Sequence, residues 1–181
     1  LDQALSDYRE ETKEWKYICD SIIRSGVEEC ILAGGEPTLH PNFFEIVQAF
    51  VSSGVKVNVL TNGTLIDEKK AKFLLDNGCL VQVSIDGGSE ETHNLTRGRD
   101  SFLKMSQGLS FLREKGVSFA TKFTITDSNF LETGDFVRLS KKLGALSANL
   151  RRCVPVGNGK EIKKMSADTL KVAYEDAFRA G

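Results

Sequence analysis

Residues 55–88, VKVNVLTNGTLIDEKKAKFLLDNGCLVQVSIDGG, decide the fold that we expect for this chain. They contain a β-branched apolar segment, a helix-like stretch that Asp67 can cap and Gly78 can end, and a second β-branched segment. Glycine suits a helix end because it accepts the left-handed backbone without a side-chain clash. A strand, a helix and a strand in this order predict a parallel βαβ unit.

The same alternation continues on both sides of this unit. Five strand candidates lie near CILAG, VKVNVL, LVQVSI, FATKFTI and SANLRRCV, and we expect them to be covered on both faces. Apolar residues at helical spacing predict helices between them, with Ser101 and Ser166 as capping residues. Each of five glycines follows a helix-like stretch and precedes a strand: Gly26, Gly54, Gly78, Gly116 and Gly144. The pattern predicts one α/β layer system.

Length and composition exclude several classes of protein. The 181 residues suit one domain, with 40% hydrophobic and 27% charged residues and a net charge of -1. That balance gives no electrostatic reason to expect binding to nucleic acid or to an anionic membrane. No apolar run approaches the roughly 20 residues that span a bilayer. We therefore expect a cytoplasmic protein without nucleic-acid or membrane partners.

The cysteines and histidines do not form a metal-binding pattern. Cys19, Cys30, Cys79 and Cys153 are widely and irregularly spaced, and the closest pair is 11 positions apart. Cys19 lies on a helix stripe and Cys30 opens a strand, so both are interpreted as small buried hydrophobes. We expect no metal ligand and no catalytic residue among the side chains of this chain.

Polar and glycine residues follow each predicted strand. In parallel βα architectures the carboxyl ends of the strands carry the functional groups. One edge of the sheet should therefore carry a site, with Gly34, Asn62, Ser84, Asn129 and Val154 near it. The candidate binding residues are Gly34, Gly35, Glu36, Pro37, Asn62, Ser84 and Arg97.

The segments AGGEPTLHP, LTNGTL, VSIDGGSEETHNLTRG and RRCVPVGNGK resemble the radical S-adenosylmethionine (SAM) superfamily, in family order and spacing. The resemblance covers residues 1–181 as one core domain. It is closest to the branch that modifies peptides and proteins or matures peptide-derived cofactors and haem-like products, often with a SPASM or twitch extension. It implies a partial (βα)6 TIM-like barrel of parallel strands, with the first βα strand missing.

The resemblance also implies a chemistry and roles for the candidate residues. Family members use SAM and a [4Fe-4S] cluster to generate a 5′-deoxyadenosyl radical, which abstracts hydrogen from the substrate. The Gly34–Gly35 backbone and Glu36 would accept from the ammonium of SAM, with Pro37 fixing the turn. Arg97 and Ser84 would hold its carboxylate, or Ser84 its ribose, beside Asn62. From the residues alone, a glycine-rich turn and solvated side chains stay possible.

The cluster motif of the family, C-x3-C-x2-C, is not in this sequence. Three thiolates on one short loop are needed to hold three irons and leave the fourth open for SAM. We expect the cluster ligands upstream of this chain, and we expect the 181 residues alone to be inactive.

Three functions compete at this point. The first is part of a radical SAM oxidoreductase or maturase. Its expected partners are SAM, a peptide, protein or cofactor precursor, and an electron donor such as flavodoxin or ferredoxin. The alternative is a degenerate, non-catalytic barrel that serves as a binding or scaffold module. The third is an unrelated hydrolase or lyase barrel, which the ordered motifs and the lack of a Ser–His–Asp constellation disfavour.

Overall fold

The protein contains one open sheet of five parallel strands. A computed structural model describes residues 15–154 and 165–181. The strand order follows the chain, and every neighbouring pair is parallel. The strands are β1 (Glu29–Leu32), β2 (Lys56–Thr61), β3 (Leu80–Ser84), β4 (Phe119–Ile125) and β5 (Ser147–Arg152). The predicted α/β class and the five predicted strands are confirmed.

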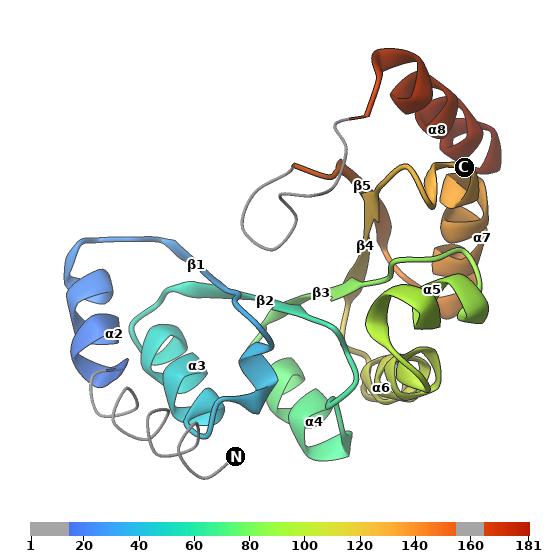
Figure 1. The fold of residues 1–181 in the computed structure, drawn as a ribbon. Helices are drawn as coiled ribbons and strands as arrows, with labels where there is room; N and C mark the ends of the chain where they lie inside the picture. The colour runs from blue at the N-terminus through green and yellow to red at the C-terminus, as the bar shows by residue number, and fades with distance from the viewer. Residues whose placement is uncertain (1–14, 155–164) are drawn as a thin grey trace, which may run out of the picture.

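Helices alternate with these strands and lie along the convex side of the curved sheet (Figure 1). Within the described ranges, none of them is long and apolar enough to cross a lipid bilayer. The α-helices are α2 (Trp15–Arg24), α3 (Phe43–Ser52), α4 (Glu68–Asp76), α5 (Glu90–Arg97), α6 (Ser101–Lys115), α7 (Thr133–Leu143) and α8 (Ala167–Ala180). Two short 3-10 helices are η1 (Pro37–Leu39) and η2 (Phe130–Glu132).

Capping residues set several of the helix ends as the sequence predicts. Asp67 Oδ1 accepts a hydrogen bond from the backbone N–H of Lys70 at 2.7 Å, and Ser166 caps α8 in the same way. Gly116 and Gly144 end α6 and α7 in the left-handed conformation. The prediction for Ser101 is wrong, because the N-cap of α6 is Asp100, with φ of 62°. Asp100 makes no side-chain capping bond, and the Ser101 hydroxyl donates to the Gly98 carbonyl at 2.7 Å.

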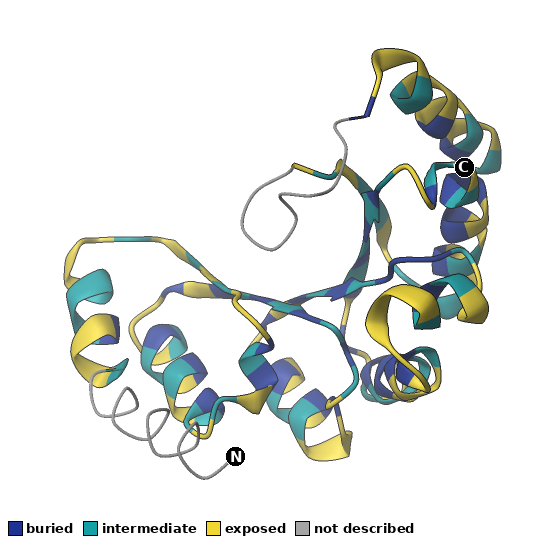
Figure 2. Cartoon of the chain, viewed as in Figure 1, coloured by how far each residue is buried: buried dark blue, intermediate teal, exposed yellow. Residues whose placement is uncertain are grey.

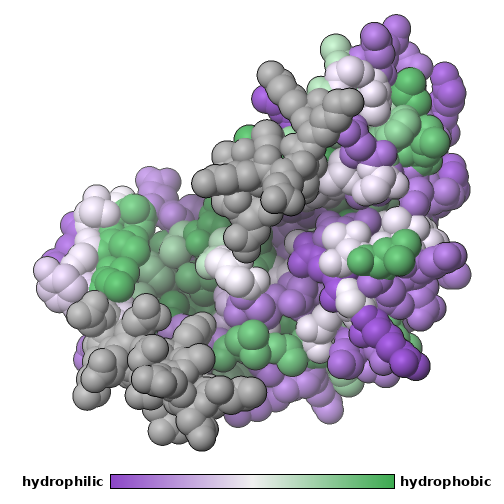
Figure 3. Space-filling model, viewed as in Figure 1, coloured by the Kyte–Doolittle hydropathy of each residue, from purple (hydrophilic) through white to green (hydrophobic). Residues whose placement is uncertain are grey.

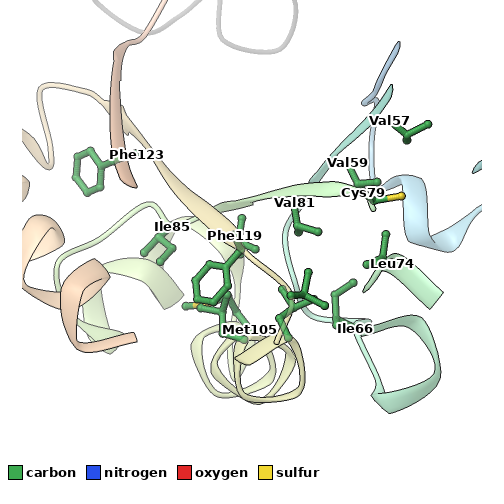
Figure 4. Packing of buried hydrophobic residues seen from close by; sticks show 14 of the residues in the cluster. Val57, Val59, Ile66, Leu74, Cys79, Val81, Ile85, Met105, Phe119 and Phe123 are labelled. Atoms are coloured by element: carbon green, nitrogen blue, oxygen red, sulfur yellow. The ribbon is translucent and has the colours of Figure 1, made fainter. Parts of the chain in front are cut away.

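The hydrophobic core fills the space between the sheet and the helices (Figure 2). Figure 4 shows its layers, with Val59 and Val81 on the sheet facing Leu74 of α4 and Met105 of α6. At the far end of the sheet the Phe123 and Phe136 rings lie 4.9 Å apart between centroids. The helices therefore cover one face of the sheet with interlocking apolar side chains.

No helix of the described part of the chain covers the other, concave face of the sheet. Along β2, β3 and β4, buried side chains alternate with half-buried or exposed ones. Asn58, Gln82 and Lys122 lie on this inner face, as the strand pairing requires. The expectation that both faces are covered is therefore wrong, and the alternating polar residues were the period-2 signal of a half-open sheet.

The loops beyond the strands gather at one edge of the sheet. Gly34, Asn62 and Val154 lie one or two residues beyond β1, β2 and β5, and Ser84 is the last residue of β3. Asn129 follows β4 and immediately precedes η2. The predicted placement of these five residues at the carboxyl edge is confirmed, and this edge is called the rim below.

Candidate functional site

The first segment of the rim is the loop after β1, which leaves its backbone open. Gly34 and Gly35 are exposed, and a Cβ at either position would meet no atom within 4 Å. Gly34 has φ of +145°, which side chains rarely adopt. A pocket of about 190 Å³ lies beside this loop and is lined in part by Gly34, Gly35, Glu36 and Pro37. The backbone amides and carbonyls of the loop can therefore contact a ligand.

The carboxylate of Glu36 holds this loop to the end of β2. Its Oε1 accepts from the Thr38 backbone N–H at 3.2 Å and from the hydroxyls of Thr38 and Thr61 at 2.5 and 2.7 Å. Its Oε2 accepts from the backbone N–H of Asn62 at 2.7 Å. The side chain is buried. Glu36 thus fixes two loops against each other. Its Oε2 accepts one hydrogen bond and so retains an unused lone pair, whereas Oε1 accepts three.

Asn62 and Ser84 differ in how much of their hydrogen-bonding capacity remains. Asn62 Oδ1 accepts from the backbone N–H and the hydroxyl of Thr64, at 2.8 and 2.7 Å, so its amide nitrogen is left as a donor. The Ser84 hydroxyl makes no hydrogen bond within the described residues and lies on the concave face, across from Lys122. Ser84 can therefore serve a ligand inside the barrel.

Arg97 is held at the rim by an acidic partner that sequence reasoning did not assign. Its Nε donates to Asp86 Oδ2 at 2.5 Å, and the Asp86 side chain is only 10% exposed. The two terminal nitrogens of the guanidinium make no other ion pair among the described residues. Because Asp86 binds only the inner nitrogen, the outer edge of the fork remains available for a carboxylate.

Two neighbours in turn fix Asp86. Its backbone N–H donates to Nδ1 of the buried His93 at 3.3 Å, and its carbonyl accepts from the Asn129 amide at 3.3 Å. Gly87 has no room for a side chain, because a Cβ there would overlap the backbone at Thr92 and His93. The Asp–Gly turn is therefore rigid, and glycine at its second position is a packing requirement.

Glu132 of η2 fastens the following turn from the far side. Its carboxylate accepts from the Gly88 backbone N–H and from the Thr92 hydroxyl, both at 2.8 Å. A Cβ at Gly88 would press against Asp135 and Glu132. Sequence reasoning missed Glu132, since 44 positions separate it from Gly88 and no local pattern marks it.

The structure brings some of the predicted residues together and separates others. Asn62 and Arg97 line one pocket of about 210 Å³, whose other walls include Arg99 and Lys104. The glycine-rich loop lines a different pocket, which the Glu36–Asn62 hydrogen bond connects to the first. Ser84 lines neither pocket, since it lies on the concave face.

The cysteines do not form a cluster site. Cys19 and Cys79 are buried as small core residues, whereas Cys30 is half-buried, so its predicted burial is only partly confirmed. Burial raises the pKa of the Cys79 thiol to about 11, which keeps it protonated. Among the described residues, which include all four cysteines, no group of three His, Cys, Asp or Glu side chains could hold a metal ion. These residues do not fit a [4Fe-4S] cluster.

Burial of His93 predicts how stability depends on pH. Loss of solvent lowers the pKa of its imidazole, with Asp86 opposing and Arg97 adding to the effect. The unfolded chain binds a proton near the ordinary pKa of 6.5, while the folded chain does not. The folded state should therefore lose stability as the pH falls below that value, until the lowered pKa of the folded state is reached.

Urea unfolding of the wild type and of His93→Asn near pH 7.5 and about pH 5.5 measures this effect. Asn carries Oδ1 at the position of the imidazole Nδ1, so it can still accept from the Asp86 N–H, but it does not titrate. The variant should therefore show the smaller loss of stability at low pH. An equal loss in both proteins would show that another group carries the pH dependence.

The fold and the rim together define the class of protein. A half-open parallel βα sheet with a glycine-rich and polar carboxyl rim is typical of barrel proteins that bind a ligand above their strands. The chain belongs to the radical SAM superfamily, whose model matches residues 5–137.

Relatives agree with this assignment, and a solved structure agrees with the fold. The chain is 34% identical over 157 residues to an AdoMet-dependent heme synthase of Methanosarcina barkeri, covering 86% of this chain and 45% of that protein. It is 31% identical over 153 residues to mycofactocin maturase MftC of Mycobacterium ulcerans, covering 83% and 41%. The structure of native anSMEcpe with bound AdoMet superposes with a TM-score of 0.76 at 24% identity, covering 92% of this chain and 50% of that one. The chain thus spans less than half the length of the curated relatives.

Proposed function

We propose that this chain is the SAM-binding part of a radical SAM enzyme, with Gly34, Gly35, Glu36, Pro37, Asn62, Ser84 and Arg97 as its ligand-binding residues. One observation carries the proposal. Glu36 joins the glycine-rich loop to the loop after β2, and close to this junction the outer edge of the Arg97 guanidinium is available to a ligand. SAM carries an ammonium, a carboxylate and a ribose, and the rim offers carbonyl acceptors, a guanidinium fork and a hydroxyl.

The residues of the chain would bind and orient SAM rather than perform the chemistry. Carbonyls of the Gly34–Gly35 loop would accept from the ammonium, and the outer nitrogens of Arg97 would donate to the carboxylate. Ser84 would donate from the concave side. In enzymes of this superfamily, bound SAM supplies a 5′-deoxyadenosyl radical that removes hydrogen from the substrate. The cluster that such enzymes use would be held by residues outside this sequence.

The reaction is proposed to serve the modification of a peptide or protein or the maturation of a cofactor. Support comes from the names of two relatives, a heme synthase and a mycofactocin maturase. The substrate would be a peptide, a protein or a cofactor precursor, and the electron would come from a small donor protein such as flavodoxin or ferredoxin. The expectation of a cytoplasmic protein is part of this proposal.

Anaerobic reconstitution tests the proposal against a non-catalytic scaffold. The chain, joined to a segment that carries the C-x3-C-x2-C motif, is loaded with iron and sulfide and reduced with dithionite. We expect 5′-deoxyadenosine from added SAM, measured by mass spectrometry. The matched control is the same protein with the three motif cysteines replaced by alanine. Binding of SAM without cleavage in a protein that holds its cluster would instead favour the scaffold.

A further inference from the structure

The concave face of the sheet contains a hollow of about 480 Å³. Its apolar wall includes Ile31, Leu60, Leu80 and Leu146, of which Ile31, Leu80 and Leu146 are more than half exposed. Apolar side chains gather in the hollow over β1 and β2 (Figure 3). This volume is in the range of small-molecule sites, which are mostly apolar with a few polar groups.

Two cations lie on the β4–β5 side of the same hollow. Lys122 and Arg151 both line it, and the strand register places Lys122 opposite Ser84 and Asn149 and places Arg151 opposite Thr124. They are therefore diagonal neighbours on adjacent strands, facing the same side.

Neither cation has an acidic partner within residues 15–154 and 165–181. Lys122 and Arg151 take part in no ion pair there, and their side chains donate no hydrogen bond. The acidic residue on the inner face of the strands is Glu29, at the opposite edge of the sheet, where it accepts from Asn58. Lys122 is half-buried, so leaving its charge uncompensated carries a desolvation cost that an anion would offset.

The two parts of the hollow are separated along the strands. Ile31 and Leu80 of the apolar wall lie level with each other across the sheet. Ser84, opposite Lys122, lies four residues beyond Leu80, about 13 Å closer to the rim. An occupant that fits both needs an apolar body and an anionic end that points toward the rim.

We infer that this hollow binds a small molecule with an apolar body and a carboxylate, which Lys122 and Arg151 recognise. Charge complementarity and the size of the hollow carry this inference. Identifying the molecule as the substrate rests on the proposed function, since Ser84, a proposed SAM-binding residue, is paired across the strands with Lys122, which lines the hollow. The two cations would then select carboxylate-bearing substrates.

Paired probes test the role of charge. The fluorescent probe 1-anilinonaphthalene-8-sulfonate has an apolar ring system with an anionic group, and N-phenyl-1-naphthylamine is its uncharged counterpart. In the double variant Lys122→Gln/Arg151→Gln we expect the anionic probe to bind about five- to tenfold more weakly than to the wild type. The neutral probe should bind as before. The matched control, Arg113→Gln/Lys142→Gln, loses the same two charge types from exposed helix positions and should bind both probes normally.

A displacement arm tests the ligand class. Bound anionic probe should be displaced by 1-naphthaleneacetate but not by its neutral amide, 1-naphthaleneacetamide. Equal displacement by both, or equal weakening of both probes in the Lys122/Arg151 variant, would overturn the carboxylate assignment.

SAM affinity should be unchanged in that variant, and a loss would mean that the cations serve SAM instead. SAM cleavage is measured in a separate experiment. A protein that does not cleave SAM would contradict the proposed function but would not change the conclusion from the probes about the hollow.

Discussion

Replacing Glu36 with alanine should lower the free energy of unfolding by about 3 kcal/mol or more. The carboxylate accepts four hydrogen bonds, from the Thr38 N–H and hydroxyl, the Thr61 hydroxyl and the Asn62 N–H. Removing a buried acceptor leaves these donors without a partner, which costs more than the loss of one exposed hydrogen bond. Urea denaturation followed by circular dichroism measures the change.

Glu36→Gln separates hydrogen bonding from packing. The amide oxygen can replace Oε1, but the amide nitrogen would face the Asn62 N–H, donor against donor. We expect a smaller loss, about 2 kcal/mol. Glu114→Ala, at an exposed position of α6, is the control and should change stability by less than about 0.5 kcal/mol. If Glu36→Ala behaved like Glu114→Ala, the carboxylate would not hold the loops together.

The sequence predicts elements that depend on local chemistry. Asp67 and Ser166 cap helices because their side chains reach a backbone N–H three residues on, and this needs no distant partner. The glycines after the helices adopt the left-handed backbone for the same local reason. The parallel direction of the strands follows from their alternation with helices, whereas the sequential order of a barrel is what the radical SAM resemblance implies.

Helix α5 was not predicted, because its only buried side chain is His93 and it has no apolar stripe. Ser89, which accepts from the Thr92 N–H, and the two acidic residues of its first turn were available as signals of a helix start.

The contacts that shape the rim could not be predicted. The Asp86–Arg97 pair spans 11 positions and the Glu132–Gly88 bond spans 44, so both depend on how α5 and η2 meet. The role of Glu36 could not be predicted for the same reason. The sequence suggests Glu36 as an acceptor for an ammonium, but its carboxylate accepts four hydrogen bonds from two loops. Motifs indicate which residue types meet, and tertiary packing decides which of their atoms stay free.

Arg97→Ala should weaken SAM binding by about 1.5–3 kcal/mol, or roughly ten- to a hundredfold. The proposed contact is a charge-assisted pair between the outer nitrogens of the guanidinium and the carboxylate of SAM. Asp86 holds the inner nitrogen, so the fork is oriented before the ligand arrives. Arg97→Lys should recover only part of the affinity, because an ammonium lacks the planar fork.

Isothermal titration of the reconstituted protein with SAM and with decarboxylated SAM measures this contact. Arg97→Ala should reduce the affinity for SAM and leave that for the decarboxylated analogue nearly unchanged, which a general loss of structure would not do. Arg99→Ala is the matched control, because Arg99 lines the same pocket but is 94% exposed, and it should bind SAM almost normally. If Arg97→Ala weakened both ligands equally, Arg97 would act by holding Asp86 and its turn in place rather than by binding the carboxylate.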